Sequence, residues 1–358
     1  MRDLREIVSA FQIDDEFLEA RPLGHGAINE TYEIICREDH YVLQKINHYV
    51  FKHPVDVMDN LFLVTEHLQK KIAEEGGDPE RETLTFIRTK GGYPLLQDED
   101  NEYYRMYRMI QGVESIEQMH TASCAENAAA AYGRFQKRLA DFDSSLLAET
   151  IPRYHDTNYQ KKLLLNAIRA DVCGRASDCE KEILFVLDRS DRFGTIEDEM
   201  RSGQIPRRVT HNDTKCSNVL MDRETKKAVC VIDLDTVMTG CALYDYGDAI
   251  RSGASAWDGG NGDRELDLEM FDAYTRGYLS EMKDGLCMRE KELMVYSAWL
   301  MTMECGIRYL ADYLGGNVYF SHMPDEKATL RKADQQFALA ADMEKKREQM
   351  EEIVRRYL

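Results

Sequence analysis

The sequence has no excess of basic residues and no long apolar run. Lys plus Arg total 46 against 65 for Asp plus Glu, so the formal net charge of the 358 residues is −19. A chain with this balance lacks the basic surface that displaces counterions from nucleic acid or binds anionic lipid. No uninterrupted apolar stretch approaches the roughly 18 residues that a transmembrane helix needs. We therefore expect neither a nucleic-acid partner nor a membrane partner.

The cysteines also lack a pattern that would indicate metal binding or a disulfide framework. There are nine of them, an odd number, and no two are spaced C-x-x-C. Cys173 and Cys179 are close in sequence but have no partners at zinc-ribbon spacing. The amino-terminal segment MRDLREIVSAFQI contains acidic residues, unlike a signal peptide. These features predict a cytoplasmic protein with reduced thiols.

The patterns of the first 111 residues predict a small lobe with an antiparallel sheet. Residues 31–36 and 41–46 have strand character and are separated by a polar turn, which predicts a hairpin. Apolar residues at helical spacing indicate a short helix at 4–12 and a longer one that starts at Pro54 and ends near Glu74. Further strands are expected at 83–87 and 103–110.

From residue 112 the chain is expected to form a larger, mainly helical lobe. The length is sufficient for two domains, and the fold class that follows is α+β. Expected helices cover residues 122–142, 159–170, 180–187, 195–200 and much of 266–358. A strand-rich island interrupts them at residues 208–234. In the last helix one apolar stripe is predicted to pack rather than to bind a partner; it consists of Leu330, Ala333, Phe337, Ala340 and Met343.

The strand-rich island carries the strongest chemical signal. His211 to Asn218 read H-x-D-x-K-x-x-N, and an apolar strand that ends in Asp233 follows. This pattern is typical of phosphoryl transfer. Asp213 would orient the attacking hydroxyl and accept its proton, and Lys215 would contact the transferring phosphoryl group. Asn218 and Asp233 would supply oxygen ligands to Mg²⁺, while His211 would brace the loop backbone.

Weaker signals upstream are consistent with a nucleotide such as ATP. Gly24 and Gly26 fit a turn whose N–H groups face phosphates, although they also fit a plain hairpin turn. Alternation places Leu43 and Lys45 on one strand face, so Leu43 could cover an adenine while Lys45 reaches the phosphates. A solvent-facing Lys45 is the alternative. Met109 and Ile110 would form a hinge that offers backbone groups to the adenine.

Several neighbouring residues have no single predicted role. Asp235 could be a second metal ligand or a brace for the loop. Glu66 is the obvious acidic partner for Lys45, but this pairing stays open. Arg251 is expected to be a structural partner of an acid in the segment 245–248 or to contact a substrate. Cys216 lies within the catalytic loop and is expected to pack there rather than to act as a nucleophile.

The order of these motifs resembles the aminoglycoside phosphotransferase and choline kinase family, the small-molecule branch of the protein-kinase-like fold. The resemblance is carried by His211-x-Asp213, Asn218, the strand end Ile232-Asp233 and the later Leu243-Tyr244-Asp245-Tyr246. Within the family, longer strings resemble the N-acetylhexosamine 1-kinase branch. These strings lie at residues 26–32, 41–44, 208–215, 232–236, 245–255, 302–308, 311–314 and 318–320.

The resemblance implies a two-lobed enzyme that uses ATP and Mg²⁺. Residues 1–111 would form the nucleotide-binding lobe and residues 112–358 the catalytic and substrate-binding lobe, with the chemistry in the cleft between them. The acceptor would be the anomeric hydroxyl of N-acetylglucosamine or N-acetylgalactosamine, with Asp213 as the base. Arg308, Asp312 and Tyr319 would bind this sugar together with Asp213. Arg308 and Asp312 are four residues apart, so a surface ion pair is the alternative for them.

Two other functions remain open at this point. The first is a kinase for another hydroxyl acceptor, such as an aminoglycoside, choline, homoserine or a different sugar. A cationic acceptor would need acids near Asp213, and one acid-rich stretch could supply them; it contains Asp258, Asp263, Glu265 and Asp267. The second is an inactive nucleotide-binding module. It would show a change at Asp213, Asn218, Asp233 or Lys45, and the sequence shows none.

Overall fold

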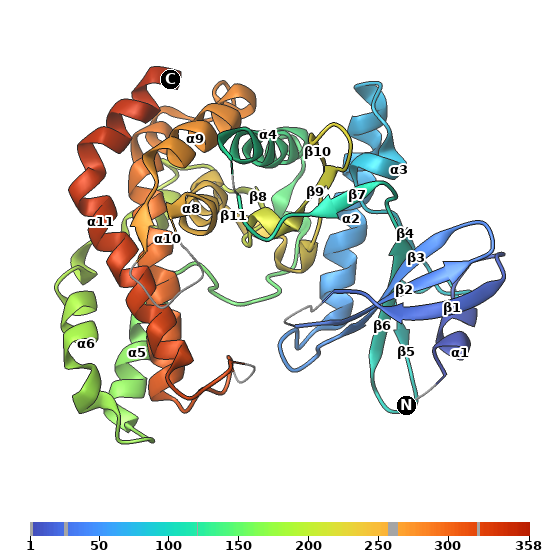
Figure 1. The fold of residues 1–358 in the computed structure, drawn as a ribbon, viewed down its shortest axis with the longest axis horizontal. Coiled ribbons are helices and arrows are strands. Elements are labelled where there is room, and N and C mark those ends of the chain that lie inside the picture. Colours follow the sequence, from blue (N-terminus) through green and yellow to red (C-terminus); the bar gives the residue numbers. More distant parts are fainter. Residues whose placement is uncertain (1–2, 25–27, 120, 257–263, 321–322) are drawn as a thin grey trace. The chain divides into compact units, whose positions relative to one another are not determined.

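The computed structural model describes residues 3–24, 28–119, 121–256, 264–320 and 323–358 (Figure 1). The chain packs into two compact units, each assembled from three segments. Unit 1 comprises Met1–Ser115, Asp141–Pro152 and Val219–Thr239, and unit 2 comprises Ile116–Ala140, Arg153–Asn218 and Gly240–Leu358. Unit 1 contains the main antiparallel sheet and unit 2 contains most of the helices, which confirms the α+β class. The boundary between residues 111 and 112 stays a prediction of domain organisation.

The main sheet of unit 1 is antiparallel throughout, in the order β1-β2-β3-β6-β4 with β5 beside β6. The predicted hairpin is confirmed as β2 and β3. The strand expected at 83–87 is only two residues long and follows helix α3 (Pro79–Glu82), which Asp78 caps, after a short irregular segment. The strands are β1 (Phe17–Pro22), β2 (Glu30–Cys36), β3 (His40–Ile46), β4 (Phe86–Ile87), β5 (Leu96–Gln97) and β6 (Tyr103–Arg108).

The two faces of this sheet have different partners. Leu43 pairs with Met106 across β3 and β6, and both belong to the apolar cluster that packs against helix α1 (Leu4–Ser9). The next pair in the register is Gln44 with Arg105, and the Arg105 guanidinium donates to Gln44 Oε1 at 2.9 Å. Because successive side chains of a strand point to opposite faces, Leu43 faces α1 and Gln44 faces away from it.

Helix α2 (Pro54–Glu74) holds the distant segments of unit 1 together. It begins at Pro54 and ends at Glu74, as predicted. Its buried Asn60 donates from Nδ2 to the carbonyl oxygens of Ala148 at 2.8 Å and Val237 at 3.0 Å, and its Oδ1 accepts the N–H of Ala148. A small second sheet has the order β10-β9-β7; its strands are β7 (Val113–Ser115), β9 (Val219–Asp222) and β10 (Ala228–Val231).

Unit 2 is built around the long helix α10, which packs on α5, α8 and α11, while α4 packs on α9 (Figure 1). The predicted packing role of the last helix is confirmed, because Ala333, Phe337, Ala340 and Met343 all lie in the core. The helices are α4 (Ala122–Arg138), α5 (Thr157–Ala170), α6 (Glu180–Leu187), α7 (Thr195–Arg201), α8 (Ala242–Gly253), α9 (Leu268–Met282), α10 (Met288–Leu314) and α11 (Ala328–Tyr357). The remaining short strands are β8 (Arg208–Thr210), β11 (Met238–Gly240), β12 (Ser255–Ala256) and β13 (Glu265–Leu266).

All nine cysteines are free thiols in the structure. Among the described residues, no helix combines the length and the apolar character needed to cross a membrane.

Candidate functional site

The loop between β8 and β9 brings three of the predicted residues together in unit 2. The carboxylate of Asp213 lies 2.8 Å from Lys215 Nζ. Asn218 Nδ2 donates to the Asp213 carbonyl oxygen at 2.8 Å and approaches its carboxylate at 3.3 Å. The side chain of Asp213 is about one-quarter exposed. An accessible carboxylate beside a cation is the arrangement that orients a hydroxyl group next to a developing negative charge.

Two acids on one face of α8 hold the backbone of this loop. Asp245 accepts the N–H groups of His211 at 3.0 Å and Asn212 at 2.8 Å. One turn later, Asp248 accepts the N–H of Thr214 at 3.0 Å. Hydrogen bonds from backbone N–H groups to buried carboxylates are strong and directional. The loop on both sides of Asp213 is therefore fixed to a buried helix.

The two acids differ in how their charge is compensated. Burial raises the pKa of Asp245, partly offset by its electrostatic interaction with His211 and then by the hydrogen bonds that it accepts. Burial also opposes the charge of Asp248, but Arg251, at 2.8 Å, outweighs it and holds the pKa of Asp248 below its usual value. This contact decides the open role of Arg251, which is the structural partner of Asp248.

His211 braces the loop, as predicted. Its ring is fully buried, and Nδ1 accepts the N–H of Asp213 at 3.2 Å. The rings of Tyr132 and Phe135 pack against it edge-on. Because Nδ1 acts as an acceptor, it carries no proton. The lone pair of Nδ1 is engaged by the Asp213 N–H and is not available to take a proton from a substrate, so the contact of His211 is one that positions Asp213.

Asp233 and Asp235 lie in unit 1, where they have different environments. Asp233 precedes the 3-10 turn Leu234–Thr236 with φ of +60°, a left-handed conformation that is costly outside glycine and common at functional sites. Asp235 is buried and forms an ion pair with Arg105, while its other oxygen accepts from Asn29 Nδ2 at 2.8 Å. Of the two roles left open for Asp235, these contacts identify the brace.

Arg105 was not predicted as a functional residue. Alternation along β6 places it on the face of the sheet away from α1, but no sequence pattern links it to an acid 130 positions later. The same applies to Asn29, which is 206 positions from Asp235. Only the tertiary structure shows that these residues hold the segment that follows Asp233.

The predicted nucleotide residues lie in unit 1 with varied surroundings. Gly24 has φ of +68°, which suits a tight turn at the end of β1, and Gly26 lies outside the described residues. Leu43 is completely buried on the α1 side, so its packing gives no support to an adenine contact. Lys45 Nζ lies 3.0 Å from Glu102 and 3.6 Å from Glu30.

The other predicted residues of unit 1 are Glu66, Met109 and Ile110. Glu66 lies 3.5 Å from Arg88, so the acidic partner of Lys45 is not Glu66. Met109 and Ile110 follow directly after β6, and the Met109 N–H donates to the carbonyl of His40 at 3.0 Å. The roles of Gly24, Gly26, Leu43, Lys45, Met109 and Ile110 stay predictions.

The predicted acceptor residues belong to unit 2. The Arg308 guanidinium lies 4.6 Å over the ring of Tyr154. Burial raises the pKa of Tyr154, with Arg308 opposing the rise and the charge of Asp213 adding to it. Asp312 accepts the N–H groups of Tyr319 at 2.8 Å and Phe320 at 3.0 Å, so it organises the loop after α10. Within the described part of the chain no Arg308–Asp312 ion pair forms, and Tyr319 is 53% exposed.

Comparisons with known proteins identify the family of this chain. The profile of the APH phosphotransferase enzyme family matches residues 19–285. The chain belongs to this phosphotransferase family. Three similar solved structures are a microcompartment-associated aminopropanol kinase, the GDP complex of aminoglycoside 2'-phosphotransferase-IIIa and a choline kinase from Cryptosporidium parvum Iowa II.

The similarity to these structures extends over nearly the whole phosphotransferase. The aminopropanol kinase is 15% identical, with 97% of this chain and 98% of that chain covered and a TM-score of 0.58. The aminoglycoside enzyme is 14% identical (91% and 94% covered, TM-score 0.58), and the choline kinase is 13% identical (92% and 90% covered, TM-score 0.56). At such identities the likeness establishes the protein-kinase-like phosphotransferase fold and leaves the acceptor open.

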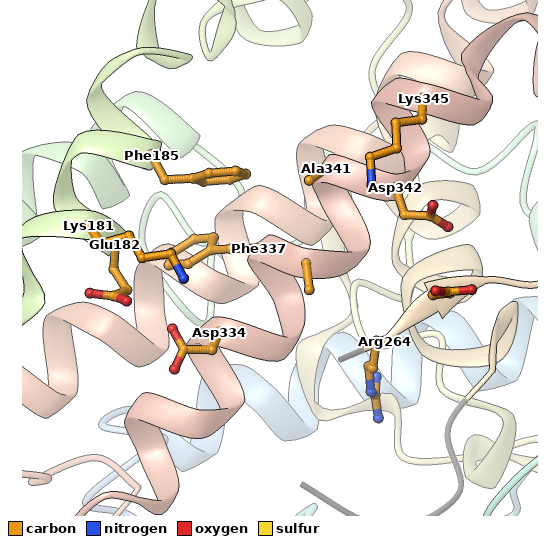
Figure 2. A pocket seen from close by; sticks show the side chains of 11 residues that line it. Lys181, Glu182, Phe185, Arg264, Asp334, Phe337, Ala341, Asp342 and Lys345 are labelled. Carbon is orange, nitrogen blue, oxygen red and sulfur yellow. The ribbon is translucent and has the colours of Figure 1, made fainter. Parts of the chain in front are cut away.

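A separate cavity of about 310 Å³ lies in unit 2 of the phosphotransferase, between α6, α11 and β13 (Figure 2). Phe185 and Phe337 form its apolar wall with ring centroids 5.3 Å apart. Lys181, Glu182 and Asp334 lie at one end, and Arg264, Asp342 and Lys345 lie at the other. None of the predicted site residues lines it.

Cys216 is predicted to be chemically inert in the folded phosphotransferase. It is buried, its Sγ donates to the carbonyl of Glu117 at 3.3 Å, and burial raises its pKa to about 11. At pH 7.5 about one thiol in a thousand or fewer would be ionised. We expect iodoacetamide to modify the exposed Cys173 and to leave Cys216 unmodified until the protein is unfolded, as read by peptide mass spectrometry. Equal modification rates in the folded protein would mean that Cys216 is a reactive thiol.

Proposed function

We propose that this phosphotransferase is an ATP- and Mg²⁺-dependent kinase that phosphorylates the anomeric hydroxyl of an N-acetylhexosamine to give the 1-phosphate. The observation that carries the proposal is the Asp213 carboxylate, 2.8 Å from Lys215 Nζ in a loop that Asp245 and Asp248 fix to α8. The family membership supports the reaction type. The acceptor is inferred from the longer sequence strings and from the charges around Asp213.

Asp213 would hold the reacting hydroxyl and accept its proton. An anomeric hydroxyl is more acidic than an ordinary alcohol, so the proton can move late in a loose transition state. Lys215 would stabilise the negative charge on the transferring phosphoryl group. Catalysis would therefore come mainly from positioning and from charge stabilisation.

Asn218 and Asp233 would bind the magnesium ion. Amide and carboxylate oxygens suit Mg²⁺, which keeps several water and phosphate oxygens and needs few protein ligands. Asn218 directs its Nδ2 to Asp213, which leaves Oδ1 as the donor atom for a metal. Asp235 is not proposed as a ligand, because its two oxygens are bound by Arg105 and Asn29. When bound, the ion would neutralise phosphate charge.

The nucleotide is proposed to bind to unit 1. Gly24 and Gly26 would place backbone N–H groups near the phosphates, and Met109 and Ile110 would offer backbone groups to the adenine. Lys45 would reach the phosphates after giving up its contacts with Glu30 and Glu102. Leu43 remains the proposed adenine contact with the least structural support, because it is buried against α1.

The charges of unit 2 favour an uncharged acceptor. Four acids of unit 2 already have partners and are not available to bind a cation. Asp245 and Asp312 accept backbone N–H groups. Asp248 pairs with Arg251, and Glu304 pairs with His155. Lys215 and Arg308 add positive charge, and both interact electrostatically with Tyr309. An acetamido sugar has a neutral carbonyl and hydroxyl groups that Arg308 and Tyr319 can recognise, whereas an ammonium group would be repelled.

The second candidate is a kinase for a cationic acceptor. It is favoured by the similar structures, which are an aminopropanol kinase, an aminoglycoside phosphotransferase and a choline kinase. The acid-rich stretch gives it little support. Asp267 caps α9 and Glu265 lines the cavity of Figure 2, while Asp258 and Asp263 lie outside the described residues.

An acceptor panel separates the two candidates. With ATP and Mg²⁺, N-acetylglucosamine, N-acetylgalactosamine, choline, 1-amino-2-propanol, homoserine and an aminoglycoside would be compared by product formation. Glucosamine is the matched control, because it replaces the acetamido group by a cation on the same ring. We expect kcat/KM for N-acetylglucosamine to exceed that for glucosamine by about 10²-fold. Turnover of choline or the aminoglycoside without any sugar 1-phosphate would refute the proposal.

A further inference from the structure

Two buried side chains outside the predicted set support the catalytic loop: His155 contacts its backbone, and Glu304 contacts His155. His155 lies just before α5 and Glu304 lies on α10, with side chains 4% and 1% exposed. His155 Nδ1 is 2.8 Å from Glu304 Oε1, and Nε2 is 3.2 Å from the carbonyl oxygen of Asn212. The second Glu304 oxygen accepts from Thr157 Oγ1 at 2.7 Å. The function proposed above assigns no role to either residue.

The contacts of His155 define where its protons lie. A peptide carbonyl can only accept, so the bond to Asn212 requires a proton on Nε2. The contact between Nδ1 and the carboxylate requires a second proton between those atoms. Thr157 donates to the second oxygen of Glu304, and Arg308 follows one turn later on α10, so both neighbours stabilise a carboxylate at Glu304 and with it an imidazolium at His155. The buried pair is then neutral overall, as burial requires.

This pair acts on the peptide that leads into Asp213. Asn212 has φ of +66°, which a residue with a side chain adopts only when its surroundings hold it. The carbonyl of the Asn212–Asp213 peptide accepts from His155, and its N–H donates to His211 Nδ1. Two imidazoles on opposite sides therefore fix the plane of this peptide, and with it the direction in which the Asp213 side chain leaves the backbone.

We propose that His155 and Glu304 are positioning residues for phosphoryl transfer, which hold the Asn212–Asp213 peptide so that the Asp213 carboxylate meets the acceptor hydroxyl. The inference rests on the proposed function of this loop and deepens it. Neither residue touches the substrate in this role. Their loss should therefore lower kcat while the KM for ATP stays unchanged.

Two variants separate this role from general stability. In Glu304→Gln, the amide can donate to Nδ1 while Nε2–H still binds the Asn212 carbonyl, so both contacts survive without a charge. We expect kcat within about threefold of the native enzyme. The double variant His155→Phe/Glu304→Leu removes both contacts without leaving a buried charge, and kcat should fall about 10²-fold, as a misplaced catalytic group predicts. His155→Gln, which can make only one of the two contacts, should lie between them and replaces the double variant if the latter does not fold.

The control is Tyr246→Phe, which removes a buried hydroxyl in the same unit whose bond, at 2.8 Å, is to Thr275 on α9 and not to the catalytic loop. It should lower the unfolding temperature without changing kcat. Rates are measured with the acceptor of the panel that turns over fastest, so an error in the acceptor class leaves the test intact. A double variant with native kcat would overturn the proposal. So would a Glu304→Gln variant as slow as the double variant.

Nitrogen-15 NMR of the imidazole ring tests the pair without any turnover. The native protein should show two protected N–H protons on His155, assigned by their loss in His155→Gln, and Glu304→Gln should show one. If no acceptor turns over, the proposed function fails while this measurement still decides the arrangement of the pair. A single ring proton in the native protein would overturn the imidazolium clamp.

Discussion

Asp213→Asn should reduce phosphoryl transfer by about 10³-fold while nucleotide affinity stays close to that of the native enzyme. Asparagine keeps the shape of the side chain, but it can neither accept the proton of the acceptor nor carry the charge that faces Lys215 at 2.8 Å. Removal of a positioned general base costs about 10²–10⁴ in rate. The loop should keep its conformation, because Asp245, Asp248 and His211 bind its backbone N–H groups and not the Asp213 side chain.

The measurement combines initial rates with calorimetry. Rates of 1-phosphate formation are recorded with saturating ATP and N-acetylglucosamine, and the affinity for a non-hydrolysable ATP analogue is recorded separately. Asp284→Asn, the same chemical change at an exposed position, serves as the control and should have native kinetics. If Asp213→Asn keeps a rate within tenfold of the native enzyme, Asp213 is not the base and another group must accept the proton.

The catalytic loop could be predicted from the sequence because its residues act over a short stretch of chain. Asp213, Lys215 and Asn218 contact one another across at most five positions, so their spacing alone nearly defines their geometry. The bracing role of His211 follows from the same local pattern. Helix boundaries such as Pro54 and Glu74 were also predictable, since proline and apolar spacing are local signals.

The supports of the site could not be predicted in this way. Asp235 is held by Arg105 and Asn29, and the catalytic loop is held by His155, whose segment has no periodic pattern. The alternation of side chains along β3 correctly predicts that Leu43 and Gln44 point to opposite faces of the sheet. It does not predict which of these two residues faces α1. Which face is covered depends on packing between elements that are distant in sequence.

Arg105→Met should destabilise the protein by about 3–5 kcal/mol, the usual cost of removing one partner of a buried ion pair. Arg105 and Asp235 are each only 3% exposed. In the variant the Asp235 carboxylate would stay buried with Asn29 as its remaining side-chain donor, since methionine cannot donate. The change is measured as the shift in the free energy of unfolding by urea, monitored by circular dichroism.

The double variant Arg105→Met/Asp235→Leu tests whether the lost stability comes from the uncompensated charge. Because it buries no ion, it should recover most of the stability lost in Arg105→Met. Equal losses in the two variants would instead assign the effect to packing of the arginine stem. The double variant also separates stability from function. Asp235 lies two residues after Asp233, in the turn that gives Asp233 its left-handed conformation. Arg105 and Asn29 hold this turn through the Asp235 carboxylate. If that turn positions a metal ligand, the double variant should fold well and still need more Mg²⁺ for half-maximal rate.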